Sequence, residues 1–214
     1  MSRPVKADAR RIELLAAAIR VLARHGLSET TTRKIAAEAR VNQATLLYYF
    51  ESKDELLFAV LHEMMRMTEE IALESRHPGA SLRDTITSSI NAFWQHVESA
   101  PELQIMQYEL TLYALRNPDA AWLAKQQYEG YCNVVETLFR EAYTEANQSS
   151  AASFDALARF VVGGLDGLIL QFVSDRNSKR ARHDLEQLIA AVLALAEGIA
   201  TLPIISVAST SNDS

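Results

Sequence analysis

Apolar residues recur every three or four positions along most of this chain, which is the period of an amphipathic helix. In residues 6–25 they fall on one helical face: Ile12, Leu15, Ile19, Leu22 and Ala23. Gly26 follows, where a glycine commonly ends a helix. Two short helices are predicted next, over 33–39 and 43–50, and Asn42 is suited to cap the second of them.

The same period continues to the C-terminal region and predicts six longer helices. Their approximate ranges are 53–76, 81–99, 102–116, 119–147, 154–174 and 184–202. Ser52 is suited to cap the first of these helices, and the charged segment 175–184 is expected to be a loop. The polar tail 204–214 is expected to be disordered. No segment alternates with the period of a strand, so the predicted fold is all-α with about nine helices.

Composition supports this fold and indicates the cellular compartment of the protein. Only 7 glycines and 5 prolines occur in 214 residues, and 49% of the residues are hydrophobic. Cys132 is the single cysteine, so no intramolecular disulfide can form, and a reducing, cytoplasmic location is expected. The N-terminus lacks the apolar segment of a signal peptide. Glu197 and Pro203 interrupt the most apolar stretch, so no membrane span is expected.

Charge divides the chain into two unlike parts. Residues 1–53 contain ten Lys and Arg against five acidic residues, whereas the remaining 161 residues carry a net charge of −11. A basic N-terminal head on an acidic body suggests that only the head meets a polyanion. We therefore predict a DNA-binding head over 1–53, followed by an effector-binding and dimerisation domain over 54–203.

Three short helices with a tight turn between the last two describe a helix-turn-helix. The third helix should present Gln43 and Thr45 to base edges, since glutamine can read adenine and threonine methyls can touch thymine. Hydroxyls and the lysine at the start of the next helix are suited to phosphates. The predicted DNA-binding residues are Thr32, Arg33, Asn42, Gln43, Ala44, Thr45, Tyr48, Tyr49 and Lys53.

The segment "GLSETTTRKIAAEARVNQATLLYYFESKDELLFAVL" resembles the DNA-binding signature of the TetR family of bacterial regulators, over about residues 8–61. One departure is Leu47, where the family usually has a tyrosine that often contacts phosphate. The segments "YELTLYALRNP" and "LDGLILQFVSDRNS" resemble the ligand domain of BetI-type members. The resemblance implies a repressor that binds a palindromic operator as a homodimer and is released by a small-molecule effector.

A head of this size makes few contacts, so two copies should read two half-sites. The helices over 154–174 and 184–202 are apolar around much of their circumference, which predicts burial on two sides. A four-helix interface is expected from Phe160, Gly164, Leu168, Leu185, Ile189, Leu193 and Ala196. The alternative is that both helices are core helices of a monomer.

An effector pocket is expected among the helices of the body, where aromatic and isolated polar residues converge. The predicted ligand-binding residues are Phe93, Trp94, Met106, Glu109, Tyr113, Trp122, Tyr128, Tyr131 and Gln171, and a wider set adds Tyr108, Gln126, Cys132 and Asp166. Such a lining favours a largely apolar or aromatic molecule. If Glu109 is buried, its carboxylate needs a partner, either a cationic group of the ligand or Arg116. The alternative is that Glu109 is a surface residue.

Catalysis and cofactor binding are not predicted. His62 and Glu63 begin no zinc-protease motif, and the five histidines lack metal-ligand spacing. Two other interpretations of the chain remain. One is an activator or a ligand-independent regulator of the same fold. The other, from a different class, is a small-molecule carrier or a protein-interaction module.

Overall fold

A computed structural model describes residues 3–145 and 152–199, and within them the chain forms nine helices and no strand. The helices are α1 (Arg3–Glu29), α2 (Thr32–Glu38), α3 (Gln43–Tyr49), α4 (Lys53–Glu74), α5 (Leu82–Ser99), α6 (Pro101–Arg116), α7 (Ala121–Glu145), α8 (Phe154–Asp175) and α9 (Ser178–Ala196). The prediction of an all-α fold is confirmed. The predicted tail 204–214 lies outside the described residues.

The N-terminal helices start and stop where local chemistry directs them. Helix α1 breaks at Gly26, whose φ of 72° is a conformation that glycine adopts at no steric cost. Thr31 caps α2 by accepting a hydrogen bond from the Lys34 amide, and Asn42 caps α3 in the same way from Thr45. Ser52 does the same for α4. These caps satisfy amides that would otherwise lack partners.

The last helix begins and ends earlier than the sequence predicted. The segment 178–184 is helical rather than a loop, because the Asn177 side chain caps it and Ala181 is buried on its inner face. Arg180 bonds to Asp184 one turn later at 2.7 Å, so the charges stabilise the first turns. At the other end α9 stops at Ala196, and Gly198 adopts a φ of 74°.

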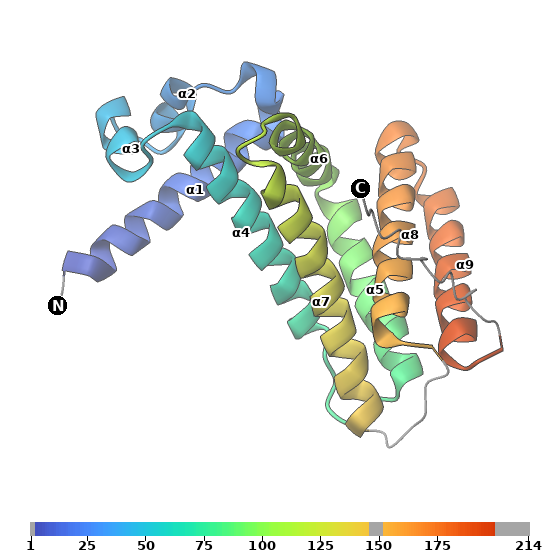
Figure 1. The fold of residues 1–214 in the computed structure, drawn as a ribbon. Coiled ribbons are helices and arrows are strands. Elements are labelled where there is room, and N and C mark those ends of the chain that lie inside the picture. Colours follow the sequence, from blue (N-terminus) through green and yellow to red (C-terminus); the bar gives the residue numbers. More distant parts are fainter. Residues whose placement is uncertain (1–2, 146–151, 200–214) are drawn as a thin grey trace, which may run out of the picture.

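Two apolar cores hold the chain together. One core joins α1–α3 to the first half of α4 and reaches α6 and α7 through Met106, Leu110 and Leu123. The other core lies among α5, α7, α8 and α9. In Figure 1 the head projects to one side, while α8 and α9 pair on the opposite side of the body. Helices α4, α6 and α7 therefore connect the two regions.

Candidate functional site

Helix α3 presents one face to solvent and one to the core of the head. Leu46 is fully buried, whereas Gln43 and Ala44 are exposed and Thr45 is half-buried. Tyr48 is 83% exposed and Tyr49 is half-buried, and the two rings meet edge to face at 5.3 Å. The polar residues that the sequence singled out therefore lie together on the free face.

The start of α3 is tied to the start of α2. The Gln43 side-chain amide donates to the Thr32 hydroxyl at 2.9 Å. Asn42 Oδ1 accepts from both the backbone amide and the hydroxyl of Thr45, at 2.7 and 2.9 Å. The four predicted residues thus form one polar cluster on the surface, with their side chains held in defined positions.

The turn between α2 and α3 depends on a left-handed residue. Arg40 has a φ of 54° and follows the last turn of α2. The Val41 amide donates to the Ala36 carbonyl at 2.9 Å, and the Arg40 amide donates to Ala37 at 3.1 Å. This pair of hydrogen bonds is a Schellman ending, which usually places glycine where Arg40 stands. The turn thereby directs α3 away from the axis of α2.

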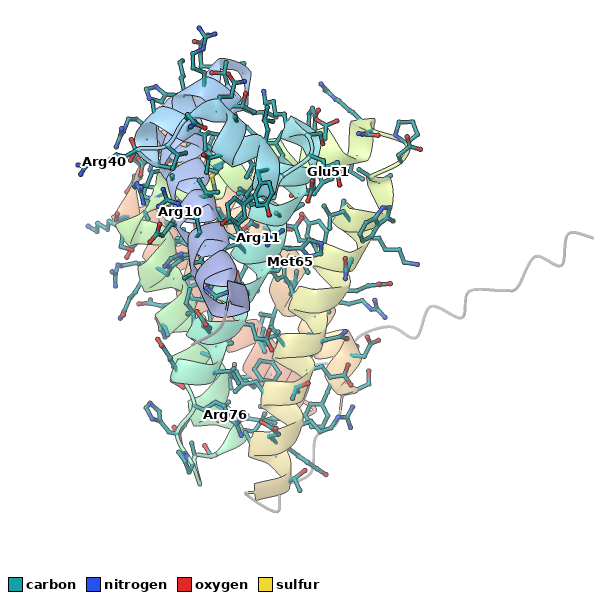
Figure 2. All side chains as sticks on the ribbon, turned by 90° about the vertical axis from the view of Figure 1, so that its left-hand side faces the viewer. Arg10, Arg11, Arg40, Glu51, Met65 and Arg76 are labelled. Carbon is teal, nitrogen blue, oxygen red and sulfur yellow. The ribbon has the colours of Figure 1, made fainter. Side chains whose placement is uncertain are left out.

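Positive side chains surround this polar cluster. Figure 2 shows Arg10, Arg11 and Arg40 along the N-terminal helices, far from Arg76 at the other end of the body. Arg20 pairs with Glu38 and Lys34 pairs with Glu29. Among the described side chains Arg33 and Lys53 form no ion pair, and Lys53 opens α4, where the backbone amides also favour an anion. Both side chains therefore remain available to an anion.

A cavity opens inside the body between α4, α5, α6, α7 and α8. The cavity has a volume of about 710 Å³ when its opening to solvent is included. Most of its wall is apolar, and Phe93, Leu138, Phe139 and Ile169 are among the lining residues. Small-molecule sites are typically concave and mostly apolar with a few polar groups. This cavity has that character.

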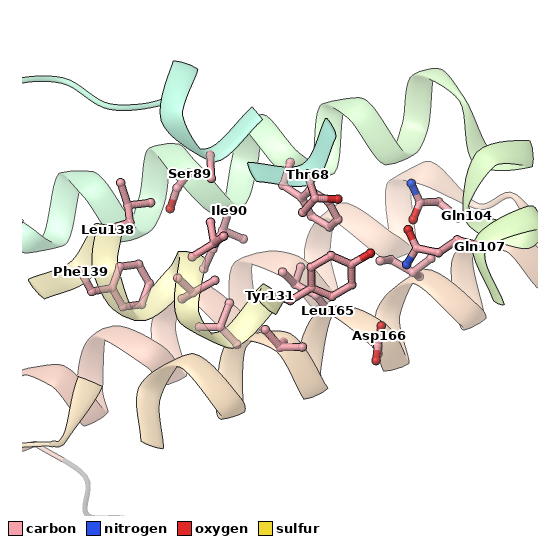
Figure 3. A pocket seen from close by; sticks show the side chains of 17 residues that line it. Thr68, Ser89, Ile90, Gln104, Gln107, Tyr131, Leu138, Phe139, Leu165 and Asp166 are labelled. Carbon is pink, nitrogen blue, oxygen red and sulfur yellow. The ribbon is translucent and has the colours of Figure 1, made fainter. Parts of the chain in front are cut away.

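Gln104, Gln107 and Asp166 gather at one end of the cavity, as the close view in Figure 3 shows, whereas Ser89 lies toward the other end. Gln104 and Gln107 are only 3% and 8% exposed. Both side chains form part of the cavity wall. The Tyr131 hydroxyl points toward Gln107 and accepts a hydrogen bond from Gln127 Nε2 at 3.2 Å.

Asp166 is the only acidic group in the lining and has no basic neighbour there. Among the described lining residues none is Lys, Arg or His. The Tyr108 hydroxyl donates to Asp166 Oδ1 at 3.2 Å, and Tyr128 also forms a hydrogen bond with this carboxylate. Burial raises the pKa of Asp166, while these two hydrogen bonds act in the opposite direction. Burial likewise raises the pKa of Tyr131 to about 12, so its hydroxyl stays protonated.

The structure brings only part of the predicted ligand-binding set together. Phe93 and Tyr131 line the cavity, and Tyr128 adjoins it through Asp166. The others lie elsewhere: Trp94 and Met106 are buried in the two cores, Glu109 and Tyr113 bond to the head and to α4, and Trp122 and Gln171 are exposed.

Two hydrogen bonds, here called the α6 hydrogen bonds, connect α6 to the end of α1 and the start of α4. The Leu27 amide, just after the break in α1, donates to Glu109 Oε2 at 2.9 Å. The Tyr113 hydroxyl donates to Asp54 Oδ1 at 2.7 Å, in the first turn of α4. Glu109 thus bonds to the backbone of the head, and it forms no ion pair with Arg116 within the described residues. The helix that supplies Gln104 and Gln107 to the cavity is also bonded to both elements that position the head.

The predicted interface residues divide between two faces of α8 and α9. Leu185, Ile189 and Ala196 are buried in the chain's own core, whereas Phe160, Gly164, Leu168 and Leu193 are half-buried at its margin. A Cβ at Gly164 would lie 2.6 Å from Leu188 Cδ1, so this glycine permits the close approach of α9 within one chain. The inner face of α9 is therefore already covered.

The middle of the outer face of α8, at Gly163, Gly167 and Leu170, is exposed and lacks charged residues. This helix is long and apolar enough to cross a membrane by length and composition, yet 33% of its most apolar window is buried inside the chain. Leu170 is 51% exposed, and a Cβ at Gly163 or Gly167 would meet no atom within 4 Å. Such a face is suited to close approach by another helix.

The polar cavity residues that sequence reasoning missed carried a recognisable signal. Gln104 and Gln107 line the cavity, and Thr111 continues the same face of α6 outside the lining, with spacings of three and four residues. All three are buried. A polar stripe on an otherwise apolar helix therefore pointed to the cavity more directly than the aromatic residues did.

The chain is similar to known bacterial regulators along most of its length. Residues 14–60 match the family model described as bacterial regulatory proteins, tetR family, and residues 81–195 match the tetracyclin repressor-like C-terminal domain. The nicotine-responsive transcriptional repressor HdnoR of Paenarthrobacter nicotinovorans is 30% identical over 86% of this chain and 94% of its own. The regulator BetI of Rhizobium meliloti is 30% identical over 44% of this chain and 46% of its own. A crystal structure of FadR from Bacillus subtilis with stearoyl-CoA shares the fold, with a TM-score of 0.65 and 21% identity over 88% of this chain and 99% of that one.

Proposed function

This chain belongs to the TetR family of ligand-responsive transcriptional repressors, and on that premise we propose that it binds a palindromic operator as a homodimer and leaves it when a small molecule fills the cavity. Residues 1–53 are the proposed DNA-binding domain, and residues 54–203 the effector-binding and dimerisation domain. The relatives are regulators rather than enzymes. The cytoplasm, where such a repressor meets DNA, is the proposed location.

One observation carries the proposal: helix α6 contributes to the cavity and is bonded to both supports of the head. Gln104 and Gln107 lie in the wall, and the α6 hydrogen bonds reach the end of α1 and the start of α4. A ligand that favours a different position of α6 would change how the two heads are held. Effector and DNA must then weaken each other's binding by the same factor.

The proposed DNA contacts fall into two kinds. Gln43 and Thr45 lie on the free face of α3 and are suited to base edges. Arg33 and Lys53 lie beside that face without ion pairs among the described side chains and are suited to phosphates. Base contacts set sequence preference, whereas phosphate contacts set affinity for any duplex.

The proposed dimer uses the outer face of α8 together with the margin of α9. Leu170, Gly163 and Gly167 leave this face open, and Phe160, Leu168 and Leu193 flank the core beneath it. Pairing with a second copy would cover apolar surface that one chain leaves in water. Two heads would then face successive turns of the major groove.

The proposed effector is a largely apolar or aromatic molecule of modest size. The cavity wall is mostly aliphatic and aromatic, and the amides and the carboxyl group in it lie at one end. Nicotine, named for the relative HdnoR, is a first compound to test. Binding to the folded protein alone would raise its melting temperature.

A band-shift experiment tests the proposed function. The duplex carries a palindrome from upstream of the chain's own gene, and a scrambled duplex of equal length and composition is the control. We expect the palindrome to bind more tightly, and log affinity to fall steeply with log salt. Gln43→Ala should reduce the preference for the palindrome by about 1–3 kcal/mol. Lys53→Ala should weaken both duplexes alike. Equal affinity for the two duplexes would contradict the proposal.

A further inference from the structure

We propose that the cavity selects a monocation, a protonated amine attached to an apolar or aromatic body, with Asp166 as its counter-ion. The inference rests on the proposed effector role of the cavity and adds the charge of the ligand to it. It is carried by a half-buried carboxylate at the polar end of an apolar cavity, with no basic side chain in the described lining.

The first argument is charge balance. Asp166 places a carboxyl group in a half-buried region of the cavity wall, where its charged form would normally need a charged partner. Its two protein partners are the hydroxyls of Tyr108 and Tyr128, which donate hydrogen bonds but carry no positive charge. Cys132 on α7 is also close enough for its pKa to be affected by Asp166. A ligand cation would supply the missing charge.

The second argument is the aromatic surroundings of the carboxylate. Tyr108 on α6 and Tyr128 and Tyr131 on α7 surround Asp166, and Phe93 on α5 lies in the same cavity. The rings of Tyr128 and Tyr131 meet edge to face at 6.3 Å. Aromatic faces attract cations, and a desolvated site strengthens the attraction. A carboxylate among aromatic rings therefore suits an alkylated ammonium group better than a neutral hydroxyl.

The third argument excludes the opposite charge. A carboxylate or phosphate ligand would require Arg, Lys, His or a free helix N-terminus, and the described lining contains none of those basic side chains. It would also lie beside Asp166 and be repelled.

Two side-chain amides complete the polar end of the cavity. Gln104 and Gln107 line the wall there, and each offers both a donor and an acceptor. They suit one further polar atom on the ligand, such as a ring nitrogen or a carbonyl oxygen. The apolar wall beyond Tyr131, with Leu138 and Phe139, would receive the rest of the molecule.

A matched series of three benzyl compounds tests the charge. N,N-dimethylbenzylamine carries the cation, isobutylbenzene replaces its ammonium by a CH of the same shape, and phenylacetate carries a carboxylate. Calorimetry at neutral pH gives the affinity of the full chain for each. Asp166→Asn is the test variant, since asparagine keeps an oxygen that can accept from Tyr108. Asp155→Asn, an exposed change on the same helix, is the control.

We expect Asp166→Asn to weaken the amine roughly tenfold or more, which corresponds to about 1.4 kcal/mol. Its affinity for isobutylbenzene should stay within about twofold, and Asp155→Asn should change neither. Three results would overturn the proposal: an amine affinity that survives Asp166→Asn, phenylacetate binding to the natural chain as tightly as the amine, or no binding of the amine at all.

The proposed function is checked separately by band shift without ligand. Without ligand, the Asp166→Asn variant and the natural chain should bind the palindrome with equal affinity, because Asp166 lies in the body on α8 and not in the head. If neither protein prefers the palindrome, the proposed function fails. The calorimetric result on the free protein would still decide the charge of the ligand.

Discussion

Glu109→Ala should release the end of α1 from α6. In the structure the Leu27 amide donates to Glu109 Oε2 at 2.9 Å. The preceding residue, Gly26, has left the helix with a φ of 72°, so this amide has no helical acceptor. The carboxylate also lies against the glycine, since a Cβ built there would be 3.3 Å from Glu109 Oε1. Truncation to alanine removes the acceptor and the packing together.

The size of the effect follows from the kind of bond. Hydrogen bonds to charged groups contribute about 1.5–3 kcal/mol, and a half-buried bond falls at the lower end because water can replace the lost partner. We therefore expect Glu109→Ala to destabilise this contact by about 1–2 kcal/mol. Glu109→Gln keeps an oxygen acceptor without the charge, so its effect should be about half as large.

Hydrogen exchange at the Leu27 amide measures this contact directly. A change of 1–2 kcal/mol corresponds to a factor of about 5–30 in the opening equilibrium, and therefore in the exchange rate. Glu129→Ala, an exposed glutamate on α7, is the matched control and should leave the rate unchanged. If Glu109→Ala exchanged within about twofold of the natural chain, the Leu27–Glu109 bond would be absent in solution and the argument would fail.

Two further substitutions test the placement of α6 and of the core. Tyr113→Phe should cost about 1 kcal/mol in unfolding free energy, because it removes the 2.7 Å hydrogen bond to Asp54; denaturant titration measures this, and an unchanged midpoint would contradict it. Trp94→Phe should change stability by less than about 1.5 kcal/mol, because a ring still packs on Phe172 and the removed indole N–H is buried without a partner among the described residues. Effector affinity, measured by calorimetry, should stay the same, and a clear loss would place Trp94 in the cavity wall.

The sequence determined most helix boundaries because they depend on local chemistry. The side chains of Asn42 and Ser52 cap the helices that follow them, as the sequence predicted. Gly26 breaks the first helix at the predicted position. The predicted start of α9 was wrong, and the reason also lies in the local sequence. Six charged residues in 175–184 favoured a loop, although the segment contains a capped first turn whose one apolar residue, Ala181, is buried.

The cavity could be predicted only in part because its wall comes from five helices. Phe93 and Trp94 are adjacent and both aromatic, yet Phe93 lines the cavity and Trp94 is buried in the core. Each helix of the body packs against several others. The local pattern of apolar residues is therefore the same whether a buried residue faces a neighbouring helix or the cavity. Asp166 was more informative, since one acid within an apolar helix has few neutral explanations.

The α6 hydrogen bonds have the energy that an effector switch requires. Coupling between two ligands typically amounts to about 1–3 kcal/mol, and two hydrogen bonds of about 1 kcal/mol each fall in that range. Gln107 and Tyr113 are six residues apart on one helix, a distance of about 9 Å along its axis. A rigid helix therefore conveys a shift at the cavity to the start of α4 with little loss. An effector bound equally well in both positions of α6 would leave the operator occupied, however tightly it bound. The polar end of the cavity, where α6 supplies Gln104 and Gln107, is the part of the wall where a ligand can distinguish those positions.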